Sequence, residues 1–248
     1  RMTAGALCGT DKEIIYDKLK GFHNYPTVLG HEGIGRVEAI GSKVKNFTVG
    51  DKIVLPFLDD GEEFYSTWGA FAEYAVIGDA EAMMEDGHTV GDGVLTEGNL
   101  GQKKIPEELD DVEAAMIVTY REVYSTMKRL GFQKGKSLVL YGAGPVGLVF
   151  ITLAKYMGLS PIICVDHTEK KLESARKCGA DYTLNFDQCD VSEEVLKILP
   201  EKADMILDAA GVPALINQNL KLVKNFGDVC IYGETAKSEY LINWEEAP

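Results

Sequence analysis

The sequence lacks a basic surplus, a long apolar run and any recognisable export signal. Its 248 residues hold 25 Lys and Arg against 39 Asp and Glu, which gives a formal net charge of −14. Nucleic acids and anionic membrane surfaces select for clusters of Lys and Arg, so this charge argues against either partner. No apolar stretch approaches the roughly 20 residues of a membrane-spanning helix, and no basic segment followed by an apolar one marks a signal peptide.

Paired cysteines are also lacking. The five cysteines stand at positions 8, 164, 178, 189 and 230, an odd and scattered set without a C-x-x-C motif. This pattern favours free thiols in a reducing, cytoplasmic setting over a disulfide framework. Nothing supplies the four closely spaced ligands of a cysteine-rich structural zinc lobe, so no structural zinc is expected.

The chain has two halves of different texture, and its length is sufficient for two domains. Residues 1–115 are rich in Gly and β-branched residues, with short alternating runs at 33–41 and 51–57 between turn residues. They predict a β-rich, barrel- or sandwich-like domain. The polar, Gly-rich stretch 78–101 predicts a long surface loop.

Residues 116–248 form the second predicted domain, which a helix over 112–130 introduces. Apolar strands and amphipathic helices then alternate: strands at 137–141, 162–166, 182–185, 204–210 and 228–232, helices at 145–157, 168–178, 192–199 and 213–225, and a sixth strand at 241–244. Such alternation predicts an α/β fold with a doubly wound parallel sheet covered by helices on both faces.

A glycine-rich turn follows the first of these strands and opens a helix. It comprises Gly142, Ala143, Gly144, Pro145, Val146 and Gly147. A G-x-G-x-x-G pattern alone is weak, but this one has the strand–turn–helix context that a dinucleotide-binding turn requires. The first glycine permits the tight turn, the second lets the backbone approach a pyrophosphate, and the third lets the helix pack on the sheet.

Asp166 ends the second strand, 19 residues past Gly147. A carboxylate there can accept hydrogen bonds from the ribose hydroxyls, which favours NAD over NADP because a 2′-phosphate would meet like charge. The nearby cations His167 and Lys171 weaken that preference. Lys171, Ala209 and Gly211 are further candidate contacts of the cofactor; the alternative is a plain glycine turn and a strand-end aspartate.

Three residues near the start of the chain suit a metal: Cys8, His31 and Glu32. A thiolate, an imidazole and a carboxylate are usual zinc ligands, and three protein ligands leave one position for water or substrate. The residues alone leave another interpretation open. A cysteine in an apolar stretch is often a buried small hydrophobe, and a histidine before a strand is often a turn residue.

Five motifs in this order cover nearly the whole chain: C-G-T-D at 8–11, G-H-E at 30–32, G-D-K-I-V at 50–54, G-A-F-A-E-Y at 69–74 and G-A-G-P-V-G at 142–147. Together they resemble the zinc-dependent medium-chain dehydrogenases, the family of alcohol, sorbitol, threonine and glucose dehydrogenases. The resemblance implies a GroES-like catalytic domain over 1–115, a Rossmann NAD-binding domain over 116–248, and an active site in the cleft between them. A homodimer or homotetramer is expected.

The same resemblance implies roles for single residues. Cys8 and His31 would hold a catalytic zinc, and Glu32 would be a direct or alternating ligand. Thr10 would hydrogen-bond the substrate hydroxyl and start a proton relay, and Asp11 would orient the imidazole of His31. Zinc would act as a Lewis acid on the substrate oxygen, and a hydride would pass to the nicotinamide.

The chain departs from the family pattern in three places. Residues 51–68 lack the four-cysteine lobe that many relatives have. Val118 stands where relatives supply a further zinc ligand, so a water or Glu122 would have to take that place, or the site is weakened. The chain also stops at Pro248, where relatives continue, so a fragment is expected.

Substrate is the least determined property. The C-G-T-D-K-E-I stretch resembles sugar and polyol dehydrogenases, and Lys12 and Glu13 fit a polyhydroxylated substrate, although both are equally consistent with solvated surface charges. Phe57 and Trp68 are candidate pocket residues or core aromatics. The leading hypothesis is a zinc-dependent, NAD-linked dehydrogenase of a secondary alcohol, polyol or sugar. The alternatives are a metal-independent enone or quinone reductase of the same superfamily and a non-catalytic nucleotide-binding protein.

Overall fold

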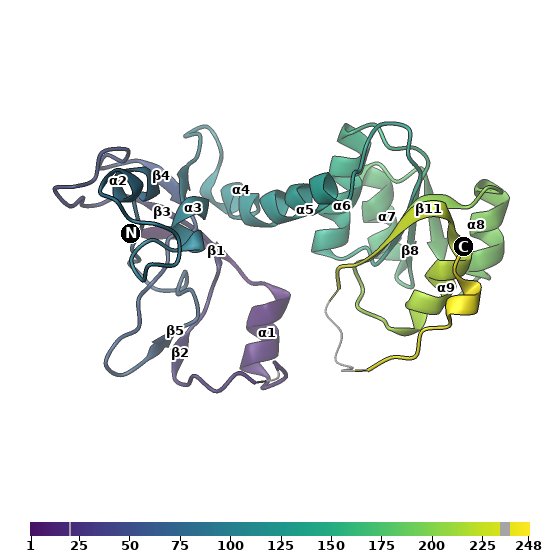
Figure 1. Ribbon diagram of the computed structural model, residues 1–248, viewed down its shortest axis with the longest axis horizontal. Helices are drawn as coiled ribbons and strands as arrows, with labels where there is room; N and C mark the ends of the chain where they lie inside the picture. Colours follow the sequence, from purple (N-terminus) through teal and green to yellow (C-terminus); the bar gives the residue numbers. More distant parts are fainter. Residues whose placement is uncertain (20, 234–238) are drawn as a thin grey trace. The chain divides into compact units, whose positions relative to one another are not determined.

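A computed structural model describes residues 1–19, 21–233 and 239–248. The chain divides into two compact units, Arg1–Tyr120 and Arg121–Pro248 (Figure 1). The division falls inside one helix, α5 (Ile117–Arg129). The expected domains, 1–115 and 116–248, stay a prediction.

The first unit contains a four-stranded antiparallel sheet with the order β1-β3-β4-β6. Its strands are β1 (Met2–Ala6), β3 (Glu32–Arg36), β4 (Lys52–Val54) and β6 (Lys103–Lys104). A separate parallel pair joins β2 (Thr27–Val28) to β5 (Tyr65–Ser66). The runs 33–41 and 51–57 each contain a strand, but a shorter one than expected. β4 ends at Val54 because Leu55 adopts a left-handed backbone conformation, φ 61°.

An apolar cluster fixes the start of the long helical segment on this sheet. Ile34 and Val54 are buried together with Ala114, Ala115 and Val118. Burying a side chain of this size contributes about 1.5–3 kcal/mol, so the cluster holds α4 (Asp111–Ala115) and the first turn of α5 against β1 and β3. The helix expected over 112–130 is wrong as a single element, because a turn at Met116 divides it into α4 and α5.

The expectation of a surface loop over 78–101 is wrong in part. Two short helices form there, α2 (Ala80–Glu85) and α3 (Glu97–Gly101). Asp79 caps α2 by accepting from Ala82 N, and Thr96 caps α3 by accepting from Asn99 N. Side-chain caps satisfy the first free N–H groups of a helix, which lets such short segments form despite poor periodicity.

In its described residues, the second unit contains a five-stranded parallel sheet with the order β11-β10-β7-β8-β9. Counted along this unit the order is 3-2-1-4-5, which is the doubly wound arrangement. Its strands are β7 (Leu138–Tyr141), β8 (Ile162–Asp166), β9 (Tyr182–Asn185), β10 (Ala203–Asp208) and β11 (Val223–Ile231). Its further helices are α6 (Pro145–Tyr156), α7 (Glu169–Cys178), α8 (Val191–Ile198) and α9 (Ala214–Leu222).

Helices cover both faces of this sheet, with α6 and α7 on one side and α8 and α9 on the other (Figure 1). Val139, Ile163 and Ile206 of neighbouring strands are buried against Val195 of α8 and Leu222 of α9. Because strand order reverses on either side of β7, the carboxyl ends of β7 and its neighbours form the edge where nucleotides bind in such folds.

Two expectations about the end of the chain are wrong. The helix over 213–225 ends at Leu222, because Val223 already pairs with Ala203 at the start of β11. Residues 241–244 are not a strand: Asn217 binds this segment to α9 by accepting from Asn243 N and donating to Leu241 O. A 3-10 turn, η1 (Trp244–Glu246), follows, with Asn243 as its cap. Within the described residues, no helix has both the length and the apolar character needed to cross a membrane.

Candidate metal centre and nucleotide site

Cys8 lies just after β1, at the start of the short helix α1 (Gly9–Ile15). Its backbone is extended, with φ −92° and ψ 168°, and the chain turns into the helix directly afterwards. The thiol is half-buried, and its Sγ lies 4.0 Å from the Thr10 hydroxyl. The short helix therefore brings the thiol and the expected relay hydroxyl to the same place.

His31 and Glu32 stand at the start of β3, opposite the end of β1. The pairing of Ala6 with Glu32 sets this register, so both ligand segments meet at one end of the sheet. Gly30 precedes them with φ 102°, and a Cβ there would lie 2.9 Å from the ring of Phe71. Only glycine fits that turn without strain. One ligand atom each from Cys8, His31 and Glu32 lies within 4.8 Å of the other two.

Asp11 holds the two segments together. It is fully buried, and its carboxylate accepts from Cys8 N at 2.8 Å and from Gly30 N at 3.2 Å. The Nδ1 atom of His31 is buried and has no hydrogen-bond partner within the described part of the chain; it lies 4.0 Å from Asp11 Oδ1, too far for a hydrogen bond. Asp11 thus acts here mainly on the backbone of the ligand segments, and its expected role in orienting the imidazole stays a prediction.

Cys8 and His31 perturb each other. A hydrogen bond with His31 lowers the pKa of the Cys8 thiol, burial opposes it, and the backbone N–H of Thr10 adds to the lowering. The same hydrogen bond with Cys8 raises the pKa of His31, again against burial. Zinc binds a cysteine as the thiolate, so the lowered pKa of the Cys8 thiol favours the form that a metal needs.

Trp68 packs against the imidazole from the outside. The ring centroids of His31 and Trp68 are 4.7 Å apart with an interplanar angle of 62°, an edge-to-face contact. Trp68 has φ 68°, a conformation that costs free energy for a residue with a large side chain, and it remains 39% exposed. Phe57 is half-buried and pairs with Val76 in an isolated bridge. Of the two aromatic candidates, Trp68 is therefore the one in contact with a candidate ligand.

The segment around Val118 supplies a hydroxyl rather than a ligand. Val118 is buried in the apolar cluster with Ile34 and Val54, so its side chain belongs to the core. The next residue, Thr119, donates from Oγ1 to Glu32 Oε1 at 2.6 Å. Glu122 belongs to the second unit, and the group of candidate ligands found among the described residues does not include it.

The chemistry of this donor set fits zinc. It combines a thiol whose pKa is lowered, an imidazole with an orphaned buried nitrogen, and a carboxylate that is 9% exposed. A buried carboxylate beside a thiolate would be unfavourable without a cation. Cys8, His31 and Glu32 would hold the ion, with a further position open to water or substrate.

The expected phosphate-binding turn lies between β7 and α6, in the second unit. Gly142 has φ 99°, and a Cβ there would lie 3.1 Å from Ala210 N. A Cβ at Gly147 would lie 1.9 Å from Gly142 O, so the helix packs on its own turn only because this residue is glycine. At Gly144, in contrast, a Cβ would meet none of the described residues within 4 Å. Pro145 and Val146 begin α6 directly after that open position, which leaves space for an anion at the helix N-terminus.

Asp166 ends β8 beside this turn and is only 5% exposed. Its Oδ2 accepts from Ala143 N and its Oδ1 from Thr168 N, each at 2.9 Å. Burial would raise the pKa of this carboxyl, but these two hydrogen bonds and the nearby Lys171 outweigh it and hold the pKa below its ordinary value. Lys171 Nζ lies 3.7 Å from Asp166 Oδ2, and His167 Nδ1 lies 3.6 Å from Oδ1.

Ala209 and Gly211 lie in the loop after β10, against the glycine turn. Ala209 N donates to Tyr141 O at 2.8 Å, and Gly211 has φ 70°. The residue that shapes this loop is Asp208, whose carboxylate accepts from the N–H groups of Ala210, Gly211 and Val212. Sequence reasoning missed Asp208 because the expected strand ran on to residue 210, whereas β10 ends at Asp208.

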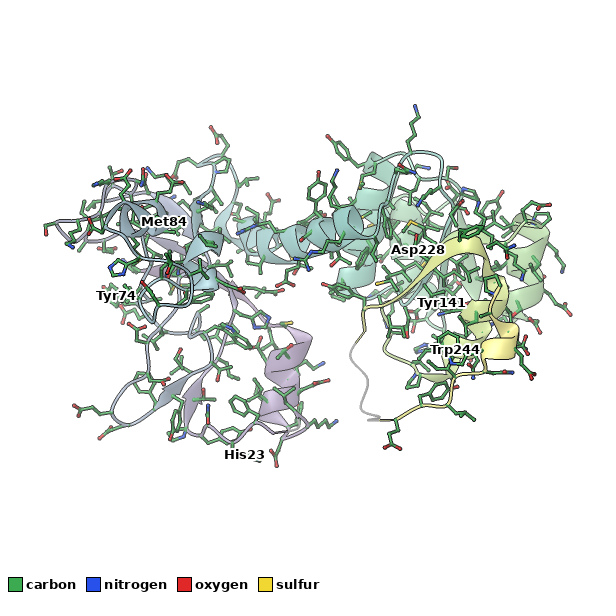
Figure 2. All side chains as sticks on the ribbon, in the orientation of Figure 1. His23, Tyr74, Met84, Tyr141, Asp228 and Trp244 are labelled. Carbon is green, nitrogen blue, oxygen red and sulfur yellow. The ribbon has the colours of Figure 1, made fainter. Side chains whose placement is uncertain are left out.

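Tyr141, the last residue of β7, lies within the second unit and is 3% exposed (Figure 2). Its hydroxyl is buried and has no hydrogen-bond partner among the residues that the structure describes. Burial and the charge of Asp208 both raise the pKa of this phenol, so it stays neutral. It contributes to the core beneath the glycine turn.

Two family models match the chain. Residues 1–86 match the model described as "Alcohol dehydrogenase GroES-like domain", and residues 145–245 match the one described as "Zinc-binding dehydrogenase". The chain belongs to the zinc-dependent medium-chain dehydrogenases. Membership confirms the expected fold class, a GroES-like part followed by a Rossmann part, and the expected class of enzyme, an oxidoreductase of the alcohol and polyol dehydrogenase type.

Several dehydrogenases are similar to this family member over nearly the whole length of its chain. Sorbitol dehydrogenase of Bacillus subtilis is 29% identical, over 98% of this chain and 69% of the relative. L-threonine 3-dehydrogenase of Photorhabdus laumondii is 28% identical, over 97% of this chain and 70% of the relative. The structure of galactitol-1-phosphate dehydrogenase from Escherichia coli matches with a TM-score of 0.78 at 22% identity, over 97% of this chain and 68% of that one, which shows a shared fold. A protein of Sinorhizobium meliloti described as a zinc-binding dehydrogenase, whose structure is bound to NADP, shares the fold with a TM-score of 0.77 at 22% identity, over 99% of this chain and 72% of that one.

Proposed function

We propose that this medium-chain dehydrogenase oxidises a secondary alcohol, polyol or sugar with NAD, using one zinc ion held by Cys8, His31 and Glu32. The observation that carries the proposal is the convergence of these three donor side chains within 4.8 Å at one end of the first unit's sheet. When bound, zinc would supply Lewis-acid polarisation of the substrate oxygen, and the nicotinamide would accept the hydride.

The chain's own residues divide the remaining work. Thr10 would hydrogen-bond the substrate hydroxyl and start a proton relay to solvent, accepting the substrate's proton as it passes on its own, since its hydroxyl lies 4.0 Å from the Cys8 thiol. Asp11 keeps the Cys8 and His31 segments at a fixed separation through two backbone hydrogen bonds. Trp68 would exclude water from one side of His31 and present an apolar edge to the substrate.

The second unit would bind the cofactor. The open position at Gly144 and the start of α6 would accept the pyrophosphate, with Pro145, Val146 and Gly147 shaping the turn and Ala209 and Gly211 lining it. Asp166 would accept from the adenosine ribose, and its charge disfavours a 2′-phosphate. Lys171 and His167, both within 4 Å of Asp166, keep NADP as the lesser alternative.

Substrate class, assembly and location follow as further parts of the proposal. The similarity to enzymes named for sorbitol, L-threonine and galactitol 1-phosphate supports a secondary carbinol with polar neighbours. The absence of a structural zinc, a homodimer or homotetramer and a cytoplasmic location are expected from the sequence.

Metal analysis tests the proposal. Purified protein should contain about one zinc per chain, and Cys8→Ser should lose both the zinc and NAD reduction in a screen of polyols, aldoses, L-threonine and simple secondary alcohols. Cys178→Ser, a half-buried thiol of the second unit, is the matched control and should keep both. Zinc content and turnover that survive Cys8→Ser would overturn the proposal, and NAD binding without turnover of any substrate would favour a non-catalytic protein.

A further inference from the structure

The contact between Thr119 and Glu32 joins residues 87 positions apart in the sequence. Both are buried, with 5% and 9% of their surface exposed. The oxygen–oxygen distance of 2.6 Å is in the range of hydroxyl groups that donate to a charged carboxylate, which are shorter and stronger than neutral hydrogen bonds. The hydroxyl of Thr119 therefore fixes the orientation of one carboxylate oxygen of Glu32.

The helix around Thr119 is placed so that this hydroxyl reaches Glu32. Val118, one residue earlier, is anchored in the apolar cluster on the sheet, which fixes the rotation of the first turn of α5. A threonine hydroxyl inside a helix commonly bonds to a carbonyl one turn back. Here it donates instead to a side chain of β3.

We propose that Thr119 is a positioning residue of the metal centre. Its hydroxyl occupies Glu32 Oε1, so that Glu32 offers Oε2 alone to the ion that Cys8 and His31 also bind. The inference rests on the proposed function, because it assumes that these three residues hold zinc. Without the hydroxyl, Glu32 is free to turn and to bind the metal through both oxygens or neither.

The affinity for zinc, measured by competition with a chelating indicator, tests this role. Thr119→Val keeps the shape and removes the hydroxyl, and it should weaken zinc binding by about 10- to 100-fold, as loss of a group that orients a metal ligand typically does. Thr119→Ser keeps the hydroxyl and should stay within about threefold of the parent affinity on the same scale. Thr126→Val, the same change on the same helix, is the control and should bind zinc as the parent does.

Two further measurements separate positioning from a general structural effect. Cobalt(II) in place of zinc should give a visible absorption spectrum that changes in Thr119→Val and is restored in Thr119→Ser, because the spectrum reports how many ligands surround the ion. In a Glu32→Ala background, Thr119→Val should have no further effect on zinc affinity, since the side chain it positions is gone. If Thr119→Val does not fold, Thr119→Ala takes its place in both comparisons.

The outcomes distinguish this inference from the proposed function. A parent chain that binds no zinc refutes the proposed function. A parent chain that binds zinc, together with a Thr119→Val variant of equal affinity and unchanged cobalt spectrum, refutes only the role of Thr119. An equal loss of affinity in the Glu32→Ala background would also refute it, because Thr119 would then act through the fold and not through Glu32.

Discussion

Replacing Asp11 by Ala should loosen the metal centre and the first unit together. Asp11 is fully buried, and its carboxylate is the acceptor for Cys8 N and Gly30 N. Ala removes this acceptor and leaves two backbone donors without a partner. The substitution thus tests whether the two ligand segments depend on one carboxylate.

The expected loss can be worked from the two hydrogen bonds. A buried donor left unpaired costs about 1–3 kcal/mol, so the buried Gly30 N–H is assigned about 2 kcal/mol and the half-buried Cys8 N–H about 1 kcal/mol. The free energy of unfolding of the first unit should therefore fall by about 3 kcal/mol. For a unit of this size that corresponds to a melting temperature lower by about 10 °C.

Thermal unfolding of the chelator-treated protein, followed by circular dichroism, measures this loss. Asp59→Ala, at an exposed position of the same unit, is the matched control and should melt as the parent does. Zinc affinity of Asp11→Ala should fall as well, because the Cys8 and His31 segments lose their common anchor. If Asp11→Ala has the melting temperature of the control and binds zinc as tightly as the parent, Asp11 does not anchor the two ligand segments.

Other predictions concern single positions. Gly147→Ala should lower the melting temperature and abolish NAD binding, since its Cβ would lie 1.9 Å from Gly142 O. Gly144→Ala should melt as the parent does, because its methyl group meets no described residue, but it should bind NAD weakly in calorimetry, because the methyl group takes the space proposed for the pyrophosphate. Hydrogen bonds from Asn46 and Lys45 outweigh burial and lower the pKa of Asp79 to about 2. Ionised Asp79 should therefore add roughly 2 kcal/mol to the free energy of unfolding above pH 4, and this contribution should be lost as the pH falls toward 2. In urea unfolding, the stability of Asp79→Asn should depend less on pH in this acid range, and an unchanged dependence would contradict the assignment. Asp166→Ala should raise the ratio of NADP to NAD turnover, and an unchanged ratio would show that another residue selects the cofactor.

The fold of the second unit could be predicted closely because its signals are local. The apolar runs at 162–166 and 182–185 match β8 and β9, since short buried strands between helices need no distant information. The error at 213–225 has the opposite cause. Val223 leaves the helix because it pairs with Ala203 across the sheet, a contact that local periodicity does not contain.

The candidate site shows the same limit. Motif order singled out Cys8, His31 and Glu32, and the structure brings them together. The contact of Thr119 with Glu32 spans 87 residues and depends on how Val118 packs, so no motif could have indicated it. Asp166 was expected to accept hydrogen bonds from the ribose of the cofactor, and in the structure both of its oxygens accept from backbone N–H groups.

That double use of Asp166 limits how the enzyme's cofactor preference can be redesigned. The carboxylate that would read the ribose is also the acceptor that fixes Ala143, the middle residue between the first two glycines of the turn. A substitution of Asp166 that is meant to admit NADP therefore also removes the hydrogen bond that holds Ala143 in the proposed pyrophosphate turn. A successful swap has to supply a new acceptor for Ala143 N in the same step, so the change requires at least two coordinated substitutions.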